Sequence, residues 1–292
     1  MASRDWEEIQ LATQEANDPG RFVTFLAYEW GGSSDIGGDH CIYFPGDKGR
    51  LLRSSPCGDS PWNPAAGEIG EPHNLTDTIR LLSDLRPMVI PHCGGRRANL
   101  DFFDPHVMPI LEIHSTHRTF EDAGFEAIRR GIKCGFIANS DDHRGSPGDG
   151  RPTARERYFS TPGGLTAVYA EKLTRESLWE AFFSRRVYGT NGARIVLATW
   201  VGDAFMGAEV SAPGGNTLPF SFQLRSDGFI DRVELMKDNE CICVFTAPWN
   251  LAHELAGERE IVVERKVHAY WVRVFQTDGG RAWSSPIWVN GM

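Results

Sequence analysis

The chain has 292 residues, of which 41% are hydrophobic and 24% charged. This composition is close to the average for folded domains and excludes disorder, collagen-like repeats and coiled coil as the main state. The formal net charge of −9 argues against nucleic acid as the main partner, because nucleic-acid binding usually needs a basic face.

A membrane partner is not expected either. No apolar run approaches the roughly 18 residues that span a bilayer, and the first residues are too polar and acidic for a signal peptide. The six cysteines show no CxxC spacing, which indicates buried thiols in a reducing compartment. We therefore expect a cytoplasmic protein.

The first two thirds of the chain alternate between helix-like and strand-like segments. Helices are expected over 3–16, 76–85 (capped by Asn74 or Thr76), 120–131 and 174–186. Apolar runs predict strands over 21–28, 41–44, 87–91, 109–113, 134–138 and 165–170. Such alternation is typical of a mostly parallel sheet or barrel with helices outside.

The pattern changes near Arg194, where helical signals almost vanish. Short alternating strands separated by turns are expected over 194–201, 218–225, 231–237, 241–246, 259–264 and 268–276, with a final strand over 282–289. This pattern predicts a small all-β sandwich. We therefore expect two domains, an α/β domain over 1–193 and a β-sandwich over 194–292.

Metal-competent side chains recur where the expected strands of the first domain end. Four strand ends carry Glu29, His92, His114 and the pair Asp141 and His143, and a further strand opens with His40. Strand ends of a barrel converge on one mouth, and imidazole and carboxylate groups suit zinc, manganese or iron. Each residue taken alone has a plainer explanation, since a lone histidine at a strand end is usually a hydrogen-bonded structural residue and Asp141–His143 could form a turn.

Other residues of the expected loops could act on a substrate. Arg96 and Arg97 follow His92, and Arg144 follows His143, where guanidinium groups could bind a phosphate or a carboxylate. A solvated basic loop explains these arginines equally well. His117 could be a metal ligand, a substrate contact or a surface residue.

The order and spacing of several motifs resemble the polymerase-and-histidinol-phosphatase (PHP) superfamily of metal-dependent phosphoesterases, in a branch with a C-terminal β-sandwich. The segments that carry this resemblance are Phe25–Trp30, Gly38–His40, Ile90–His92, Leu111–Ser115, Ile137–His143, Gly164–Ala170, Arg186–Arg194 and Trp283–Val289. The resemblance implies a distorted (β/α)7 barrel with a two- or three-metal cluster, and hydrolysis of a phosphate ester by metal-bound hydroxide. It also implies Glu29, His92, Asp141 and His143 as ligands, with His40 and His114 as ligands or near neighbours.

One departure from the family is large. Its members begin with a strand carrying a His-x-His pair and a second strand ending in Asp-His, whereas residues 1–28 contain no histidine. The barrel is therefore expected to be incomplete. Either its start is truncated, or the protein is a reduced form, or a partner supplies the missing strands. An open sheet edge would follow, which a homo-oligomer could cover.

The function predicted from the sequence is a metal-dependent hydrolase, most simply a phosphoesterase, acting on a small anionic, phosphorylated substrate. Two or more divalent ions (Mn, Zn or Fe) would be bound by Glu29, His40, His92, Asp141 and His143. The predicted catalytic residues are His114, His117 and Arg144, and the predicted substrate-binding residues are Arg96 and Arg97. The alternatives are a non-catalytic remnant that serves binding or assembly and, less favoured, a carbohydrate-associated protein.

Overall fold

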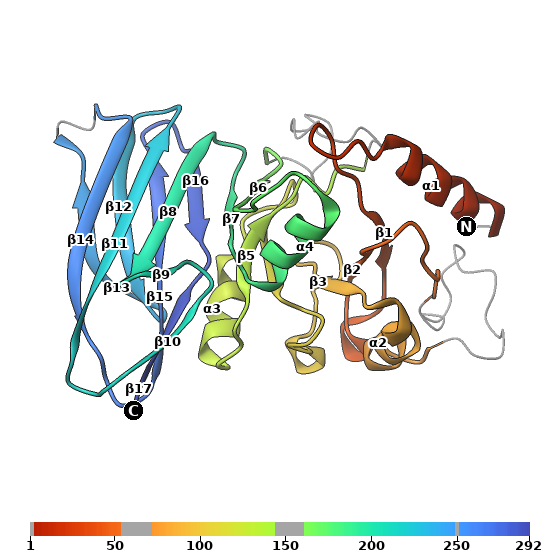
Figure 1. The fold of residues 1–292 in the computed structure, drawn as a ribbon, viewed down its shortest axis with the longest axis horizontal. Helices are drawn as coiled ribbons and strands as arrows, with labels where there is room; N and C mark the ends of the chain where they lie inside the picture. Colours follow the sequence, from red (N-terminus) through yellow and green to blue (C-terminus); the bar gives the residue numbers. More distant parts are fainter. Residues whose placement is uncertain (1–2, 54–71, 144–160, 249–250) are drawn as a thin grey trace. The chain divides into compact units, whose positions relative to one another are not determined.

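The computed structural model describes residues 3–53, 72–143, 161–248 and 251–292 (Figure 1). The chain divides into two compact units, each built from two stretches of sequence. Unit 1 comprises Met1–Pro109 with Ala170–Glu180, and unit 2 comprises Ile110–Tyr169 with Ala181–Met292. This division differs from the boundary between residues 193 and 194 that the strand pattern suggested.

Unit 1 is built on a small antiparallel sheet in which β2 (His40–Phe44) lies between β1 (Leu26–Trp30) and β3 (Met88–Pro91). The register pairs Trp30 with His40 and His40 with Pro91. Side chains of β2 alternate, so that His40, Ile42 and Phe44 are buried. The short 3-10 turns of this part of the chain are η1 (Ser34–Ile36), η2 (Ser83–Leu85) and η3 (Leu100–Phe102).

Two helices supply the rest of the unit 1 core. In α1 (Ser3–Ala16), Trp6 packs edge-on against Tyr28, with ring centroids 5.6 Å apart. Helix α2 (Leu75–Leu82) begins at Asn74, whose side-chain oxygen accepts the Asp77 N–H at 2.9 Å. This N-cap satisfies one of the free amide groups at the helix start, as the sequence predicted.

Unit 2 starts with a parallel strand pair, β4 (Ile110–His114) and β5 (Gly135–Ala138), joined through α3 (Glu121–Arg129). The next strands, β6 (Leu165–Val168) and β7 (Val187–Thr190), pair antiparallel and belong to a large sheet. Helix α4 (Arg175–Phe183) lies between β6 and β7 in the sequence.

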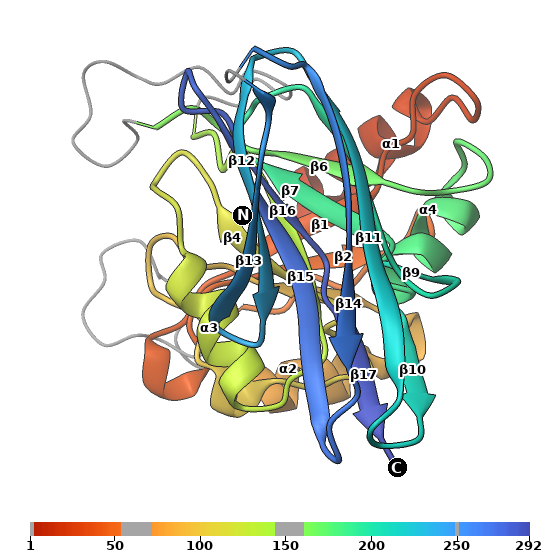
Figure 2. The same cartoon turned by 90° about the vertical axis from the view of Figure 1, so that its left-hand side faces the viewer.

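The remainder of unit 2 is a β-sandwich. The large sheet has the order β10-β17-β15-β16-β7-β6, with β12 pairing β15 and β13 pairing β12, and the second sheet has the order β14-β11-β8-β9. Figure 2 shows β11 and β14 running side by side, in agreement with their register from Thr217–Val262 to Arg225–Glu254. The strands are β8 (Ile195–Val201), β9 (Ala204–Phe205), β10 (Glu209–Ala212), β11 (Thr217–Ser226), β12 (Ile230–Lys237), β13 (Glu240–Thr246), β14 (Glu254–Val262), β15 (Val267–Gln276), β16 (Arg281–Ser284) and β17 (Ile287–Gly291).

The inward residues of both sheets form one apolar core. Leu197 on β8 and Phe222 on β11 come from one sheet, and Val233 on β12 and Val272 on β15 come from the other. All four are at most 1% exposed. Most of the sandwich strands expected from the alternating pattern are therefore found near their predicted bounds. The expected final strand is instead two strands, β16 and β17, and the sequence did not predict β9 and β10.

The expected (β/α)7 barrel is wrong. The described residues form no barrel, and most of their regular structure is strand. The expectation took alternating helices and strands as a sign of parallel pairing, but β1, β2 and β3 pair antiparallel. Among the described strands of the first 193 residues, only β4 and β5 have the parallel pairing that a crossover helix produces. None of the described helices is long and apolar enough to cross a bilayer.

Candidate metal centre

The candidate site of unit 2 is built from the loops that follow β4 and β5. Because these strands are parallel, their carboxyl ends lie at the same edge of the pair. Backbone groups join the loops directly, since the Asn139 N–H donates to the His114 carbonyl at 2.9 Å and the Thr116 N–H donates to the Ser140 carbonyl at 3.0 Å. The Thr116 hydroxyl also donates to the Asp141 carbonyl at 3.1 Å.

A third segment fixes the same two loops. The Thr161 hydroxyl lies 2.7 Å from the Thr116 carbonyl and 2.9 Å from the Ser115 carbonyl. The Gly164 N–H donates to the Asn139 carbonyl at 2.8 Å. The backbone under the site is therefore held by hydrogen bonds from three separate stretches of chain, which favours a single conformation.

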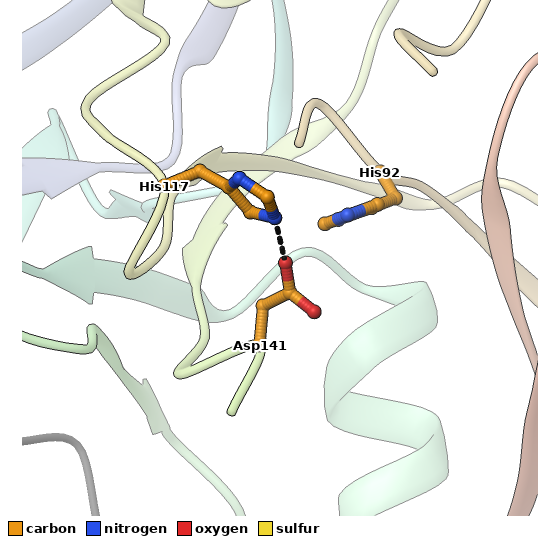
Figure 3. A group of neighbouring side chains, drawn as sticks. All are labelled: His92, His117 and Asp141. Atoms are coloured by element: carbon orange, nitrogen blue, oxygen red, sulfur yellow. Dashed lines mark ion pairs between the residues drawn. The ribbon is translucent and has the colours of Figure 1, made fainter. Parts of the chain in front are cut away.

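Asp141 lies between two imidazole rings. Its Oδ2 is 2.7 Å from His117 Nε2, and its Oδ1 is 3.4 Å from His143 Nε2. The two imidazole rings are nearly perpendicular, at 84°, with centroids 6.2 Å apart. Figure 3 shows the His117 and Asp141 side chains facing each other; the third residue drawn there, His92, belongs to unit 1.

The backbone of Asp141 is in a conformation that few side chains adopt. Its φ of 48° lies in the left-handed region, where a non-glycine residue carries a cost of order 1–3 kcal/mol. Aspartate tolerates this region better than most residues because its short polar side chain can hydrogen-bond locally. Such a conformation persists only where the surroundings enforce it, and the threonine hydrogen bonds described above do so.

The three side chains have the chemistry of a metal site. Imidazole nitrogens and carboxylate oxygens suit zinc, manganese or iron. His117 and Asp141 are largely buried, with 15% and 14% of their side chains exposed, whereas His143 is 57% exposed. His143 is thus the most exposed of the three side chains.

The catalytic role predicted for His114 stays a prediction, and neighbouring groups hold its ring. Its Nδ1 lies 2.9 Å from the Thr119 hydroxyl and its Nε2 lies 2.9 Å from the Pro162 carbonyl, so both ring nitrogens are engaged. The ring also stacks on Trp283, at 5.8 Å between centroids. Burial lowers the pKa of His114 below its ordinary value, against the opposing effect of the Pro162 carbonyl. His114 therefore positions the loop that carries His117.

The remaining predicted metal ligands belong to unit 1. His40 is 1% exposed, and burial lowers its pKa to about 4, assisted by the nearby His92 and opposed by a hydrogen bond to the Gly38 carbonyl. His92 is 3% exposed and follows β3, and Glu29 is exposed on β1, where it pairs in register with Cys41. That Glu29, His40 and His92 share one pocket with Asp141 and His143 stays a prediction.

The predicted substrate residues have different surroundings. Arg96 Nε lies 2.8 Å from Asp39 Oδ1, and the Arg97 carbonyl accepts a hydrogen bond from the Ser34 hydroxyl at 3.0 Å. Arg144 lies outside the described residues. Asp39 is not among the residues predicted from the sequence, although its position directly before His40 and after a glycine-rich stretch was a usable signal.

Comparison with known families gives a partial match. Residues 143–217 match the family model described as "Protein of unknown function (DUF3604)". An uncharacterized protein of Chlamydia pneumoniae is 33% identical over 186 residues, which cover 56% of this chain and 28% of that protein. An uncharacterized protein of Chlamydia muridarum is 30% identical over 177 residues, covering 56% and 28% respectively. The chain thus spans less than a third of the length of these relatives.

Comparison with solved structures gives likenesses too distant to carry any argument about this chain. The fibronectin(III)-like modules of Clostridium thermocellum CbhA align with a TM-score of 0.24 at 18% identity, over 32% of this chain and 94% of that one. A chitin binding domain from Burkholderia pseudomallei aligns with a TM-score of 0.24 at 12% identity, over 29% of this chain and 57% of that one.

The resemblance to the PHP superfamily is wrong, because the family model that matches the chain is a different one, of unknown function, and the relatives above are uncharacterized. The α/β barrel implied by that resemblance is withdrawn with it, and the expectation of a phosphoesterase loses the support of the family. The comparisons contain no evidence for a hydrolase, so any catalytic role has to be argued from the side chains of the site alone.

Proposed function

We propose that the chain is a metal-dependent hydrolase whose cation is bound in unit 2 by His117, Asp141 and His143. The observation that carries this proposal is that the Nε2 atoms of two histidines face opposite oxygens of one carboxylate. An ion pair alone does not require a strained backbone. Here Asp141 has two imidazole neighbours and a φ of 48°.

A bound divalent cation would polarise the substrate and lower the pKa of a coordinated water. The chain's own residues provide the setting. The Asp141 carboxylate supplies negative charge to a mostly buried position, and the engaged ring of His114 holds the start of the loop that carries His117. The exposed His143 leaves access for a small molecule. A small anionic, phosphorylated substrate remains the proposed class.

Metal analysis of the purified full chain tests the proposal. We expect stoichiometric zinc, manganese or iron, and hydrolysis of a generic aryl phosphate after metal-stripped protein is reloaded with these ions. His117→Ala and Asp141→Asn should abolish the rate. His106→Ala is the matched control, because His106 is exposed on a unit 1 loop.

Two outcomes would overturn the proposal. If the purified protein contains no metal and none of the three ions gives a rate, the proposed metal centre is refuted. If the protein contains stoichiometric metal but does not hydrolyse the substrate, the enzymatic role is refuted and a metal site that serves binding or assembly remains.

A further inference from the structure

Unit 1 contains an arginine that is fixed on one side and open on the other. The Asp39 side chain is only 4% exposed, and both of its oxygens bind Arg96. Oδ1 accepts the side-chain Nε–H at 2.8 Å, and Oδ2 accepts the backbone N–H at 2.8 Å. A buried carboxylate therefore holds both the loop and the root of the guanidinium group in one orientation.

The outer edge of this guanidinium has no partner among the described residues. The Arg96 side chain is 54% exposed, and its contact with Asp39 uses Nε alone, so the two terminal nitrogens remain available. A surface arginine of this exposure normally samples many rotamers, and the fixed Nε reduces the entropy lost when an anion binds.

Three glycines make this arrangement possible. A Cβ at Gly31 would clash with Arg96 Nη2 and lie 3.3 Å from its Cζ, so the guanidinium occupies the space that a side chain would fill. A Cβ at Gly95 would lie 2.7 Å from Asp39 Oδ2, and the φ of Gly95 is +50°. A Cβ at Gly38 would clash with the Arg97 carbonyl. Segments 31–39 and 94–97 can therefore approach each other closely because glycines stand at these three points of contact.

The glycine loop also has unused donors. The backbone N–H groups of Gly31 and Gly32 donate to no acceptor in the part of the chain that the structure describes. Gly31 lies directly against the guanidinium. Amide donors beside a fixed arginine are the groups that bind phosphate and carboxylate oxygens.

We propose that Arg96, positioned by Asp39 and seated on Gly31, binds a small oxyanion in unit 1. The shared chemistry is that of a phosphate or carboxylate group, which accepts paired hydrogen bonds from the planar guanidinium. Asp39 and Gly31 are positioning residues, and Arg96 is the residue that contacts the anion. This site consists of unit 1 residues and does not depend on the metal centre of unit 2.

The test is calorimetric titration of the metal-stripped full chain with inorganic phosphate and, in a separate arm, with acetate. We expect saturable binding of at least one anion, weakened about tenfold or more by Arg96→Gln. Gly31→Ala should weaken it to a similar extent, because the methyl group displaces the guanidinium. Gly46→Ala is the matched control, since a Cβ there meets nothing within 4 Å.

The two arms and the variants separate the outcomes. Phosphate binding alone, acetate binding alone or both would identify the oxyanion. The proposal would be overturned if neither anion binds saturably, or if Arg96→Gln binds as tightly as the parent chain. The Asp39–Arg96 contact would then only stabilise the loop. If Gly31→Ala fails to fold, Arg96→Gln decides alone. The use of metal-stripped protein means that failure of the hydrolase proposal leaves this result unaffected.

Discussion

Replacing Arg273 should strongly destabilise unit 2. Its guanidinium joins α3 to the large sheet, with Nη1 at 3.0 Å from Glu121 Oε2 and Nη2 at 2.5 Å from Glu234 Oε2. The Trp283 indole N–H donates to the other oxygen of Glu121 at 2.5 Å. The guanidinium also makes a cation–π contact with Phe125, with 5.8 Å between its Cζ atom and the ring centroid.

The size of the effect follows from burial. The side chains of Arg273, Glu121 and Glu234 are 18%, 19% and 11% exposed. Replacing Arg273 by Met keeps much of the apolar stem, leaves the largely buried Glu121 carboxylate without its cation, and leaves Glu234 paired with Arg232 alone. Removing one partner of a buried ion pair costs about 3–5 kcal/mol, and the remaining exposure reduces this to about 2–4 kcal/mol. The midpoint of thermal unfolding should fall by roughly 5–15 °C.

Urea unfolding followed by tryptophan fluorescence measures this loss, and a double-mutant cycle isolates its cause. Glu121→Gln removes one of the two carboxylates, so the double variant Arg273→Met with Glu121→Gln should lose less than the sum of the single changes. Arg225→Met is the control, because Arg225 pairs with Glu254 at 3.4 Å with 77% and 70% of the side chains exposed. A loss below about 1 kcal/mol for Arg273→Met, or additivity in the cycle, would refute the reasoning.

Three further predictions concern single residues. Asp141→Asn should weaken zinc binding by about tenfold or more in calorimetry, with His106→Ala unchanged; equal affinity would contradict the assignment of the metal ligand. The pKa of His40 is lowered to about 4 by burial, so its neutral form stabilises the fold above pH 6.5, and this stabilisation is lost as the pH falls toward 4. Between pH 7 and pH 4, the free energy of unfolding of the His40→Gln variant should therefore fall by about 3 kcal/mol less than that of the parent chain, as measured by urea titration. An equal fall in both proteins would contradict this reasoning. Gly189→Ala should cost about 1–3 kcal/mol relative to Gly46→Ala, because its Cβ would lie 2.8 Å from the backbone of β5; unchanged urea midpoints would show that β5 can move away.

The sandwich could be predicted from the sequence because its signal is local. Along β11, burial alternates residue by residue from Phe220 to Ser226, and a period of two is visible without knowing the partner strand. The cap at Asn74 is local in the same sense, since it needs only the amide three residues later. Pairing direction is a non-local property, and no short pattern distinguishes the antiparallel pairing of β2 with β3 from the parallel pairing of β4 with β5.

The candidate site was predictable to the same limited extent. Strand-end positions indicated that Asp141 and His143 are functional candidates, and the structure places His117 with them. The contact of Asp39 with Arg96 joins residues 57 positions apart and depends on a glycine in a third segment. A contact between residues this far apart in the sequence cannot be predicted from local spacing, even where each residue type is common in binding sites.

His114 and His117 show why residue type and position do not define a role. They lie three residues apart in the same loop region, yet one ring is fixed by Thr119 and Pro162 and the other faces a carboxylate. The buried ring helps to hold the loop, and burial lowers its pKa. The His117 ring instead faces the Asp141 carboxylate. The chemistry of the site thus depends on which of two neighbouring histidines has its ring nitrogens already engaged.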